Sequence, residues 1–206
     1  MDFLQSIVSF FASIIILICT SLDIPIYPMG QKINLDNFTE TFTEEFSGEL
    51  DRSVWSGHYQ YGDKTVSRKG SYWNKNLVYT ENGNLIIPIV YLEDGMGGMG
   101  AGWYTAGIDT DSDAKNGFSQ KFGYFECRCI LPKGSDIWSA FWLMNSGVFD
   151  VDGSGRDGTE IDIFESDGYE MLFNHNISSN LHFDGYNDAH QKLGATRFLL
   201  KNRKKG

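Results

Sequence analysis

Basic residues are scarce in this sequence. Lys and Arg number 17 against 27 Asp and Glu, which gives the 206 residues a formal net charge of −10 at pH 7. A chain with this charge repels polyanions, so we expect no nucleic-acid partner. Proline is also scarce, with 4 residues against 23 glycines, while aromatic residues make up 15% of the chain. This composition favours short strands and glycine turns over helices or disorder.

Cysteine is rare too, and three residues cannot form a fully paired disulfide framework within one chain. Cys19 lies in an apolar N-terminal run, whereas Cys127 and Cys129 are separated by one residue. In a strand this spacing points both side chains to one face, at the limit of disulfide geometry. We therefore predict that Cys127 and Cys129 are reduced thiols in the core, and no metal-binding CxxC pair is present.

The N-terminus has no basic residue ahead of its apolar stretch. Residues 10–22 (FFASIIILICTSL) have the length of the hydrophobic region of a signal peptide and are short for a membrane span of about 20 residues. Asp2 precedes the run, and no small-residue cleavage site follows it. Residues 1–22 are interpreted as a signal peptide or an uncleaved anchor, which predicts a secreted protein. Residues 23–206 are predicted to form one domain.

Long helical patterns are missing from the rest of the chain. Apolar or alternating runs recur between turn residues, at 84–91, 104–110, 123–131, 138–144, 159–164 and 178–183. Short strands spaced in this way indicate an all-β sandwich or barrel. Residues 95–102 (GMGGMGAG) are predicted to form a loop between strands, because no helix follows that could hold a phosphate. The segment 38–46 fits a helix as well as a strand.

Three acidic residues lie close together in one predicted strand, the segment 159–166 (TEIDIFES). Strand alternation points Glu160 and Asp162 to one face, and Ile161 and Ile163 to the other, which identifies the second face as the core. Neighbouring carboxylates repel one another and form strands poorly, so at least one should have a raised pKa. Local stability does not explain why the three acids lie together, so they indicate a functional site.

The third acid does not fit a regular strand. Unbroken alternation would put Phe164 in solvent beside the acids and Glu165 in the core, and both placements are unfavourable. One bulged residue near Ile163 and Phe164 shifts the side-chain phase by one, so that Phe164 turns inward and Glu165 joins the first two acids. We predict this bulge.

Two carboxylates on one face suit glycoside hydrolysis, in which one attacks the anomeric carbon and the other protonates the leaving oxygen and later deprotonates water. A retaining mechanism needs the carboxyl groups about 5–5.5 Å apart. In a flat strand the Cα atoms of Glu160 and Glu165 would be on the order of 13 Å apart. The chemistry therefore predicts a concave sheet, with both side chains leaning over Asp162.

The hexapeptide at 160–165 (EIDIFE) resembles the E-x-D-x-x-E signature of glycoside hydrolase family 16, in its bulged, laminarinase-like form. Further stretches stand in family order: TEEF at 43–46 with Trp55, NGNL at 82–85, YTAG at 104–107, YFECR at 124–128 with LP at 131–132, WSAFW at 138–142 and NLHF at 180–183. The resemblance covers about residues 40–194. It implies a jelly-roll β-sandwich of two antiparallel sheets, with a concave cleft for an extended β-glycan.

The resemblance also implies roles for residues at matching positions. Glu160 is expected to be the nucleophile, Glu165 the general acid/base, and Asp162 the partner that hydrogen-bonds and tunes the nucleophile. Trp138 matches the family tryptophan beside the scissile sugar, and His182 matches the histidine near the acid/base.

Four further residues are expected to contact substrate, because aromatic rings stack on sugar faces and polar groups bind hydroxyls. Arg68 and Asn76 fall where the family often has sugar-contacting polar groups. Trp142 fits the core as well as the cleft rim, and Trp103 fits ordinary packing as well as a sugar platform.

His190 shows no partner spacing and is interpreted as a solvated or hydrogen-bonded residue.

The activity implied is an endo-acting, retaining hydrolase of β-1,3 or mixed β-1,3/1,4 glucans, acting on polysaccharide as a monomer. The alternatives are a non-catalytic, lectin-like β-glycan-binding module, or a hydrolase of a marine galactan. Binding modules of this fold typically lack one or both catalytic glutamates, and both are present here. The family domain continues beyond the stretch matching 180–194, so we expect a C-terminally truncated domain.

No cofactor is implied by the resemblance. Residues 150–155 (DVDGSG) begin like a calcium loop, but the twelfth position is Ile161 rather than Glu, so a polar hairpin loop is the better interpretation. Some family members hold a structural calcium near the segment matching Glu45, and we make no calcium prediction from this.

Overall fold

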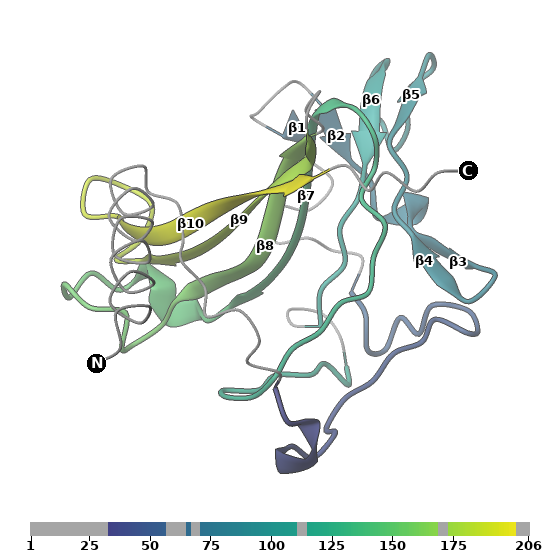
Figure 1. Ribbon diagram of the computed structural model, residues 1–206. Coiled ribbons are helices and arrows are strands. Elements are labelled where there is room, and N and C mark those ends of the chain that lie inside the picture. The colour runs from purple at the N-terminus through teal and green to yellow at the C-terminus, as the bar shows by residue number, and fades with distance from the viewer. Residues whose placement is uncertain (1–32, 57–64, 67–70, 111–114, 169–172, 201–206) are drawn as a thin grey trace, which may run out of the picture. The chain divides into compact units, whose positions relative to one another are not determined.

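The structure is a computed structural model (Figure 1), which describes residues 33–56, 65–66, 71–110, 115–168 and 173–200. In these ranges the regular structure consists of strands and three 3₁₀ turns, so the predicted all-β class is confirmed. The predicted signal peptide or anchor (1–22) and Arg68 lie outside the described residues. Among the residues described, no helix is long and apolar enough to cross a membrane.

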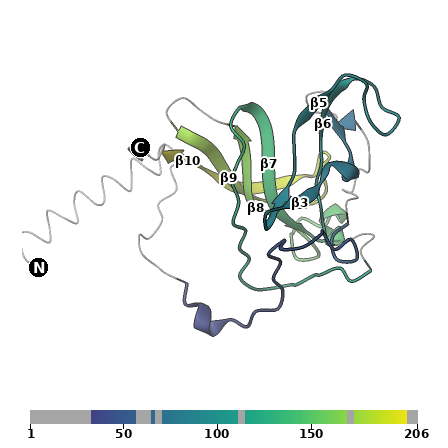
Figure 2. The same cartoon turned by 90° about the vertical axis from the view of Figure 1, so that its right-hand side faces the viewer.

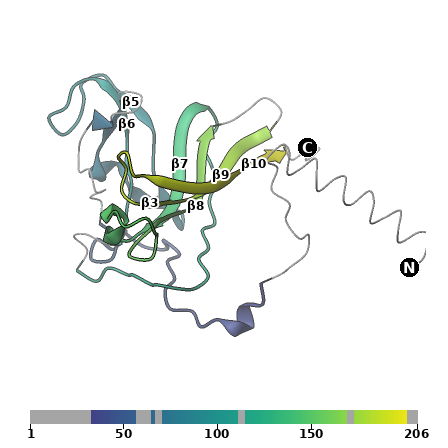
Figure 3. The same cartoon turned by 90° about the vertical axis from the view of Figure 1, so that its left-hand side faces the viewer.

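The chain divides into two compact units, of which the one that begins at Glu126 holds the three acids. Its four strands form an antiparallel sheet in the order β10-β9-β8-β7 (Figure 1). They are β7 (Ser135–Met144), β8 (Glu160–Gly168), β9 (Phe173–Phe183) and β10 (Gln191–Leu200). The sheet is not flat, since β7 bends along its length in two perpendicular views (Figure 1, Figure 3). This bending agrees with the predicted curvature.

Strand β8 carries the predicted bulge. Asp162 pairs with Asn180 of β9 and Glu165 pairs with Ser178, so three steps along β8 match two steps along β9. The ladder between β8 and β7 slips by one residue at the same place. One extra residue in β8 accounts for both shifts, and Ile163 has no partner in either ladder. The three acids therefore share one face of the sheet.

The opposite face of β8 is only partly buried. Phe164 lies on it beside Phe141 of β7, with ring centroids 6.4 Å apart. Ile161, Leu181 and Leu193 form one row across β8, β9 and β10 and are 39%, 38% and 60% exposed. The prediction that the aliphatic face is the core is therefore wrong at Ile161.

A buried aspartate organises the connection between β7 and β8. Asp184, which is 2% exposed, accepts hydrogen bonds from the backbone N–H groups of Asp152 (3.0 Å) and Gly153 (2.9 Å). The connection also contains the 3₁₀ turn η3 (Ser146–Phe149), which begins after Asn145. Residues 150–155 form no strand and lie between β7 and β8, as expected of a loop, and within it Oδ1 of Asp152 accepts the N–H of Ser154 at 2.8 Å.

The other unit, Ile33–Phe125, contains a four-stranded sheet in the order β1-β2-β6-β5 and a two-stranded hairpin of β3 and β4 (Figure 2). Its elements are η1 (Leu35–Asn37), β1 (Thr65–Val66), β2 (Ser71–Trp73), η2 (Lys75–Leu77), β3 (Tyr79–Glu81), β4 (Asn84–Ile86), β5 (Val90–Leu92) and β6 (Gly102–Thr105). The β2–β6 pair is parallel and the other pairs are antiparallel.

Tyr104 is the centre of this second unit. Its side chain is fully buried and stacks on Tyr72 with ring centroids 4.9 Å apart. Its hydroxyl donates to the carbonyl of Gly100 at 2.6 Å and accepts from the N–H of Met96 at 3.0 Å. These bonds tie down the connection between β5 and β6, and the predicted loop at 95–102 is confirmed except for its last residue, where β6 begins.

Several predicted strands differ from the structure. Residues 123–131 form no strand, and Cys127 and Cys129 are free but exposed thiols rather than core residues. The segment pairs with no described strand, and Ile130 within it is 98% exposed. The strand predicted at 84–91 is split because Pro88 has no N–H for a ladder. The segment 38–46 is neither helix nor strand.

Candidate active site

The face that bears the three acids is built by register across the sheet. Trp142 of β7 and Asn180 of β9 flank Asp162, and His182 of β9 lies opposite Glu160. Asp162, at the centre of the group, is 3% exposed, whereas the two glutamates are partly exposed. A buried central carboxylate between two reachable ones suits a substrate that approaches from this face.

Both carboxylate oxygens of Glu165 accept hydrogen bonds. The indole Nε1 of Trp138 donates to Oε1 at 2.8 Å, and the Nδ2 of Asn180 donates to Oε2 at 2.6 Å. Two donors from different strands fix the orientation of the carboxylate. Trp138 is nevertheless 52% exposed, so part of its ring remains open to a sugar. Trp138 is expected beside the scissile sugar, and this role stays a prediction, to which its contact with Glu165 lends support.

We expect Trp138→Phe to lower kcat about tenfold with little change in KM, because phenylalanine keeps an aromatic ring and loses the N–H that orients Glu165. Trp138→Ala should lower kcat and raise KM as well, since it also removes the ring. Steady-state kinetics on a substrate that the parent protein cleaves measures both. An unchanged kcat in Trp138→Phe would show that the hydrogen bond does not orient the carboxylate.

Glu160 is contacted from the loop that follows β9. The hydroxyl of Tyr186 donates to Oε2 of Glu160, and the Tyr186 ring packs edge to face on Phe149 with centroids 5.7 Å apart. The chain turns back at Asp184 and Gly185, whose φ angles are 59° and 71°. Left-handed backbone at two successive positions brings the tyrosine back over the sheet. A phenolic donor favours the ionised form of Glu160.

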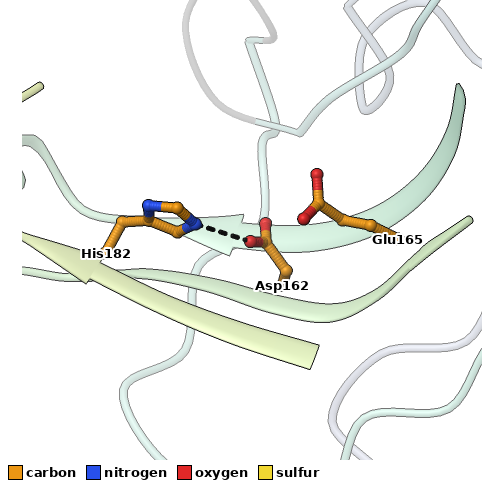
Figure 4. A group of neighbouring side chains, drawn as sticks. All are labelled: Asp162, Glu165 and His182. Atoms are coloured by element: carbon orange, nitrogen blue, oxygen red, sulfur yellow. Dashed lines mark ion pairs between the residues drawn. The ribbon is translucent and has the colours of Figure 1, made fainter. Parts of the chain in front are cut away.

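Asp162 faces a histidine of the neighbouring strand β9. The Nε2 of His182 lies 3.3 Å from Oδ2 of Asp162 (Figure 4). That oxygen is buried and makes no well-formed hydrogen bond within the described part of the chain. The contact places the histidine against the central acid, closer in register to Glu160 than to Glu165.

Burial and mutual repulsion shift the protonation of the group. Burial, followed by the interactions with Asp162 and then Glu165, raises the pKa of Glu160 to about 7. Burial likewise raises the pKa of Asp162 to about 6, with the charge of Glu165 as the next cause. The predicted rise in at least one pKa is confirmed. Burial lowers the pKa of His182, helped by Lys192 and His190, so this histidine is neutral near pH 7.

The raised pKa values predict a pH-dependent cost in stability. Glu160 and Asp162 titrate above their ordinary values of 4.5 and 3.8, so the folded state favours their protonated forms. That contribution is present below the ordinary values and is lost as pH rises through about 6 to 7. We expect Glu160→Gln to raise stability at pH 8 by on the order of 1 kcal/mol after discounting for partial exposure, or about 2–4 °C in Tm.

Thermal unfolding at pH 5 and pH 8 measures this effect. The gain in Glu160→Gln should be clear at pH 8 and small at pH 5. The exposed Glu93 supplies a control, since Glu93→Gln should leave Tm unchanged at both values. Equal Tm values for the parent protein and Glu160→Gln at pH 8 would show that ionised Glu160 does not destabilise the folded protein.

The same face offers potential metal ligands. Asp162, Glu165 and His182 each place one ligand atom within 4.8 Å of the others (Figure 4), and they form the one such group among the residues that the structure describes. Both oxygens of Glu165 already accept N–H groups. Each oxygen of Glu165 therefore already has one donor within the fold.

The other predicted site residues fall into two groups. Trp142 pairs with Asp162 and is partly exposed, which places it on the acidic face rather than the opposite one. Trp103 is 53% exposed on β6 and lies edge to face with Tyr91 at 5.5 Å. Asn76 is exposed in η2, where its N–H donates to the side chain that precedes the turn. Both belong to the Ile33–Phe125 unit, and their contact with substrate stays a prediction.

Two residues that contact the acids were not predicted from the sequence. Asn180 has a visible signal, because it lies two residues before His182 on one strand and so shares its face. Tyr186 has none, because it reaches Glu160 through a turn with unusual backbone angles.

Comparisons with known proteins agree with this geometry. The family described as "Glycosyl hydrolases family 16" matches residues 66–202, more than half of the chain. The endo-1,3-1,4-beta-glycanase ExsH of Rhizobium meliloti (strain 1021) is 28% identical over 160 residues, which is 68% of this chain and 32% of that protein. The chain thus spans about a third of the length of this relative.

Two solved structures are similar as well. The catalytic domain of an endo-1,3-beta-glucanase (laminarinase) from Thermotoga petrophila RKU-1 has a TM-score of 0.52 at 24% identity, over 77% of this chain and 62% of that one. An endo-beta-1,3-glucanase from Pyrococcus furiosus has a TM-score of 0.47 at 24% identity, over 77% and 60%. The first of these similarities shows the fold.

Proposed function

Because the chain belongs to glycosyl hydrolase family 16, whose members are glycosidases with a jelly-roll β-sandwich, we propose that it is an endo-acting, retaining β-glucanase. The predicted family and fold class are confirmed. The observation that supports the proposed mechanism is the bulge in β8, which turns Glu160, Asp162 and Glu165 to one face. Without it, Glu165 would point away from the other two.

In the proposed first step, an oxygen of Glu160 attacks the anomeric carbon, and the bond from that carbon to the leaving oxygen breaks. Glu165 gives its proton to the leaving oxygen. A carboxyl group has about four lone-pair sites, so a proton finds a place on Glu165 beside the bonds from Trp138 and Asn180. Positive charge that develops on the sugar favours the ionised form of Glu160, as does the hydroxyl of Tyr186.

In the proposed second step, water attacks the anomeric carbon of the glycosyl-enzyme, and Glu165 takes the proton of that water. The two N–H donors on Glu165 favour its ionised form, which is the form that acts as a base. Glu160 leaves as a carboxylate. Two displacements at one carbon return the original β configuration.

The proposed substrate is a β-1,3 or mixed β-1,3/1,4 glucan, bound as a polysaccharide. The relatives described above support this choice, because their names specify endo-1,3-1,4-β-glycanase and endo-1,3-β-glucanase activities. The exposed indole of Trp138 beside Glu165 offers a sugar platform at the point of cleavage. A polysaccharide substrate also fits the export that we propose for residues 1–22.

Reducing-end release separates the candidate functions. The full-length protein, incubated with laminarin, lichenan, agarose and carrageenan, should release reducing ends from laminarin or lichenan. Release from agarose or carrageenan alone would favour a galactan hydrolase. Binding to a glucan without cleavage of any of the four would make the protein a lectin-like module and contradict the proposal.

A further inference from the structure

Two histidines are joined on the acidic face. The Nδ1 of His182 and the Nε2 of His190 are 2.8 Å apart, and the two ring planes differ by 5°. Nearly parallel planes that contain atoms 2.8 Å apart are too close for face-to-face stacking, so the rings lie side by side, joined by a hydrogen bond. Since Nε2 of His182 faces Asp162 at 3.3 Å, a line of contacts runs from Asp162 through His182 to His190.

His190 is itself held in place at the start of β10. Its backbone N–H donates to the carbonyl of Asn187 at 3.0 Å, and its ring packs on Tyr186 with centroids 5.6 Å apart. His182 pairs with Lys192 of β10, which brings the residues before β10 alongside the end of β9. The second imidazole is therefore fixed by the fold and not only by its partner.

The direction of the hydrogen bond between His182 and His190 decides whether His182 presents a proton or a lone pair to Asp162. A neutral imidazole carries one N–H, on one of its two nitrogens. If Nδ1 of His182 carries the proton, the bare Nε2 points its lone pair at the buried oxygen of Asp162, and two acceptors face each other. If His190 donates instead, Nε2 of His182 carries the proton and offers it to that oxygen. The second arrangement satisfies a buried acceptor that otherwise stays unpaired.

We propose that His190 is a positioning residue that donates its Nε2–H to Nδ1 of His182, and so fixes the tautomer of His182 whose Nε2–H faces Asp162. This inference rests on the proposed glycosidase function, in which Asp162 tunes Glu160. His190 acts through His182 and touches neither substrate nor the reacting atoms.

The charged and titratable groups around His182 set the pH response. Asp162 and Glu165 face it from β8, and Lys192 faces it from β10, while His190 and Tyr186 adjoin it from the loop. Once the donor from His190 is lost, Asp162 has a poorer partner in its ionised form and holds a proton to higher pH. The acid limb of the pH profile of kcat should therefore move to higher pH.

Three variants test the direction of the bond. His190→Phe keeps a ring and has no donor, His190→Asn keeps polarity but is too short to reach, and His190→Gln keeps an N–H at nearly the distance of Nε2. We expect ¹⁵N NMR of His182 to show one tautomer, protonated at Nε2, in the parent protein and His190→Gln. His190→Phe and His190→Asn should show mixed tautomers.

Kinetics supply the second readout. His190→Phe and His190→Asn should lower kcat about tenfold with KM little changed and move the acid limb upward, and His190→Gln should restore both. If His190→Phe does not fold, judged by circular dichroism, His190→Asn gives the same test. An unchanged His182 tautomer in the folded variant without a donor would overturn the inference. Failure of the proposed function is distinguishable, because it would appear as a parent protein that cuts no glucan.

Discussion

Glu160→Ala is expected to lower kcat for glucan hydrolysis by on the order of 10⁴-fold or more, because the proposed nucleophile is removed and water at its place is a much weaker attacking group. KM should change far less, since the aromatic and polar contacts to the sugar remain. The loss is measured on laminarin or lichenan, and on an aryl β-glucoside oligomer with an activated leaving group. Glu160→Gln should be as inactive while keeping nearly the same shape.

Added azide tells a nucleophile apart from a residue that merely supports the fold. In Glu160→Ala, azide can enter the space of the missing carboxylate, attack the anomeric carbon directly and yield the α-glycosyl azide with inversion. Turnover of the aryl substrate should rise with azide concentration. Glu93→Ala, which changes an exposed glutamate in the other unit, should retain full activity and form no azide product. Absence of rescue in a folded Glu160→Ala protein would count against the nucleophile assignment.

Glu165→Ala is expected to lower kcat on natural glucans by on the order of 10³–10⁴-fold, because the leaving sugar oxygen then departs without a proton. The loss should shrink greatly for an aryl leaving group with a low pKa, which needs no protonation. Breakdown of the glycosyl-enzyme becomes slow, so a burst of phenol should precede the steady state. On the same variant, reducing-end release measures the loss on natural glucans, and stopped-flow absorbance measures both the turnover and the burst with the aryl substrate.

Azide should act on Glu165→Ala with the opposite stereochemistry. It attacks the glycosyl-enzyme from the side where water normally enters, which yields the β-glycosyl azide. An α-azide from Glu165→Ala, together with a β-azide from Glu160→Ala, would exchange the roles of the two glutamates. Equal losses on natural and activated substrates would remove the acid/base role from Glu165.

The bulge could be predicted because two residues conflict with a regular strand. Regular alternation would expose Phe164 and bury Glu165, and one added residue repairs both faults. The ladders to β7 and β9 place that residue at Ile163. Strand alternation in β9 likewise places Asn180 and His182 on one face, because they are two residues apart. The site on β8 and β9 therefore follows from period-two geometry and from the costs of burying charge and exposing an aromatic ring.

The features that the sequence did not predict correctly depend on contacts between distant segments. Tyr186 reaches Glu160 through left-handed backbone at Asp184 and Gly185, and no spacing in the sequence encodes that path. His190 was interpreted as solvated or hydrogen-bonded, and the structure shows the hydrogen bond but not through any local pattern. Residues 123–131 have an alternating sequence, yet a strand forms only where a neighbour supplies its ladder, and none of the described strands does so.

In the proposed reaction, the acids that the bulge turns to one face cut a β-glycosidic bond in two displacements. Proton NMR of the first product released from laminarin or lichenan, recorded before the sugar mutarotates, distinguishes two displacements from one. We expect the new reducing end to appear first as the β anomer and the α anomer to grow in afterwards. A first product in the α form would mean a single displacement by water, and Glu160 could not then be the nucleophile.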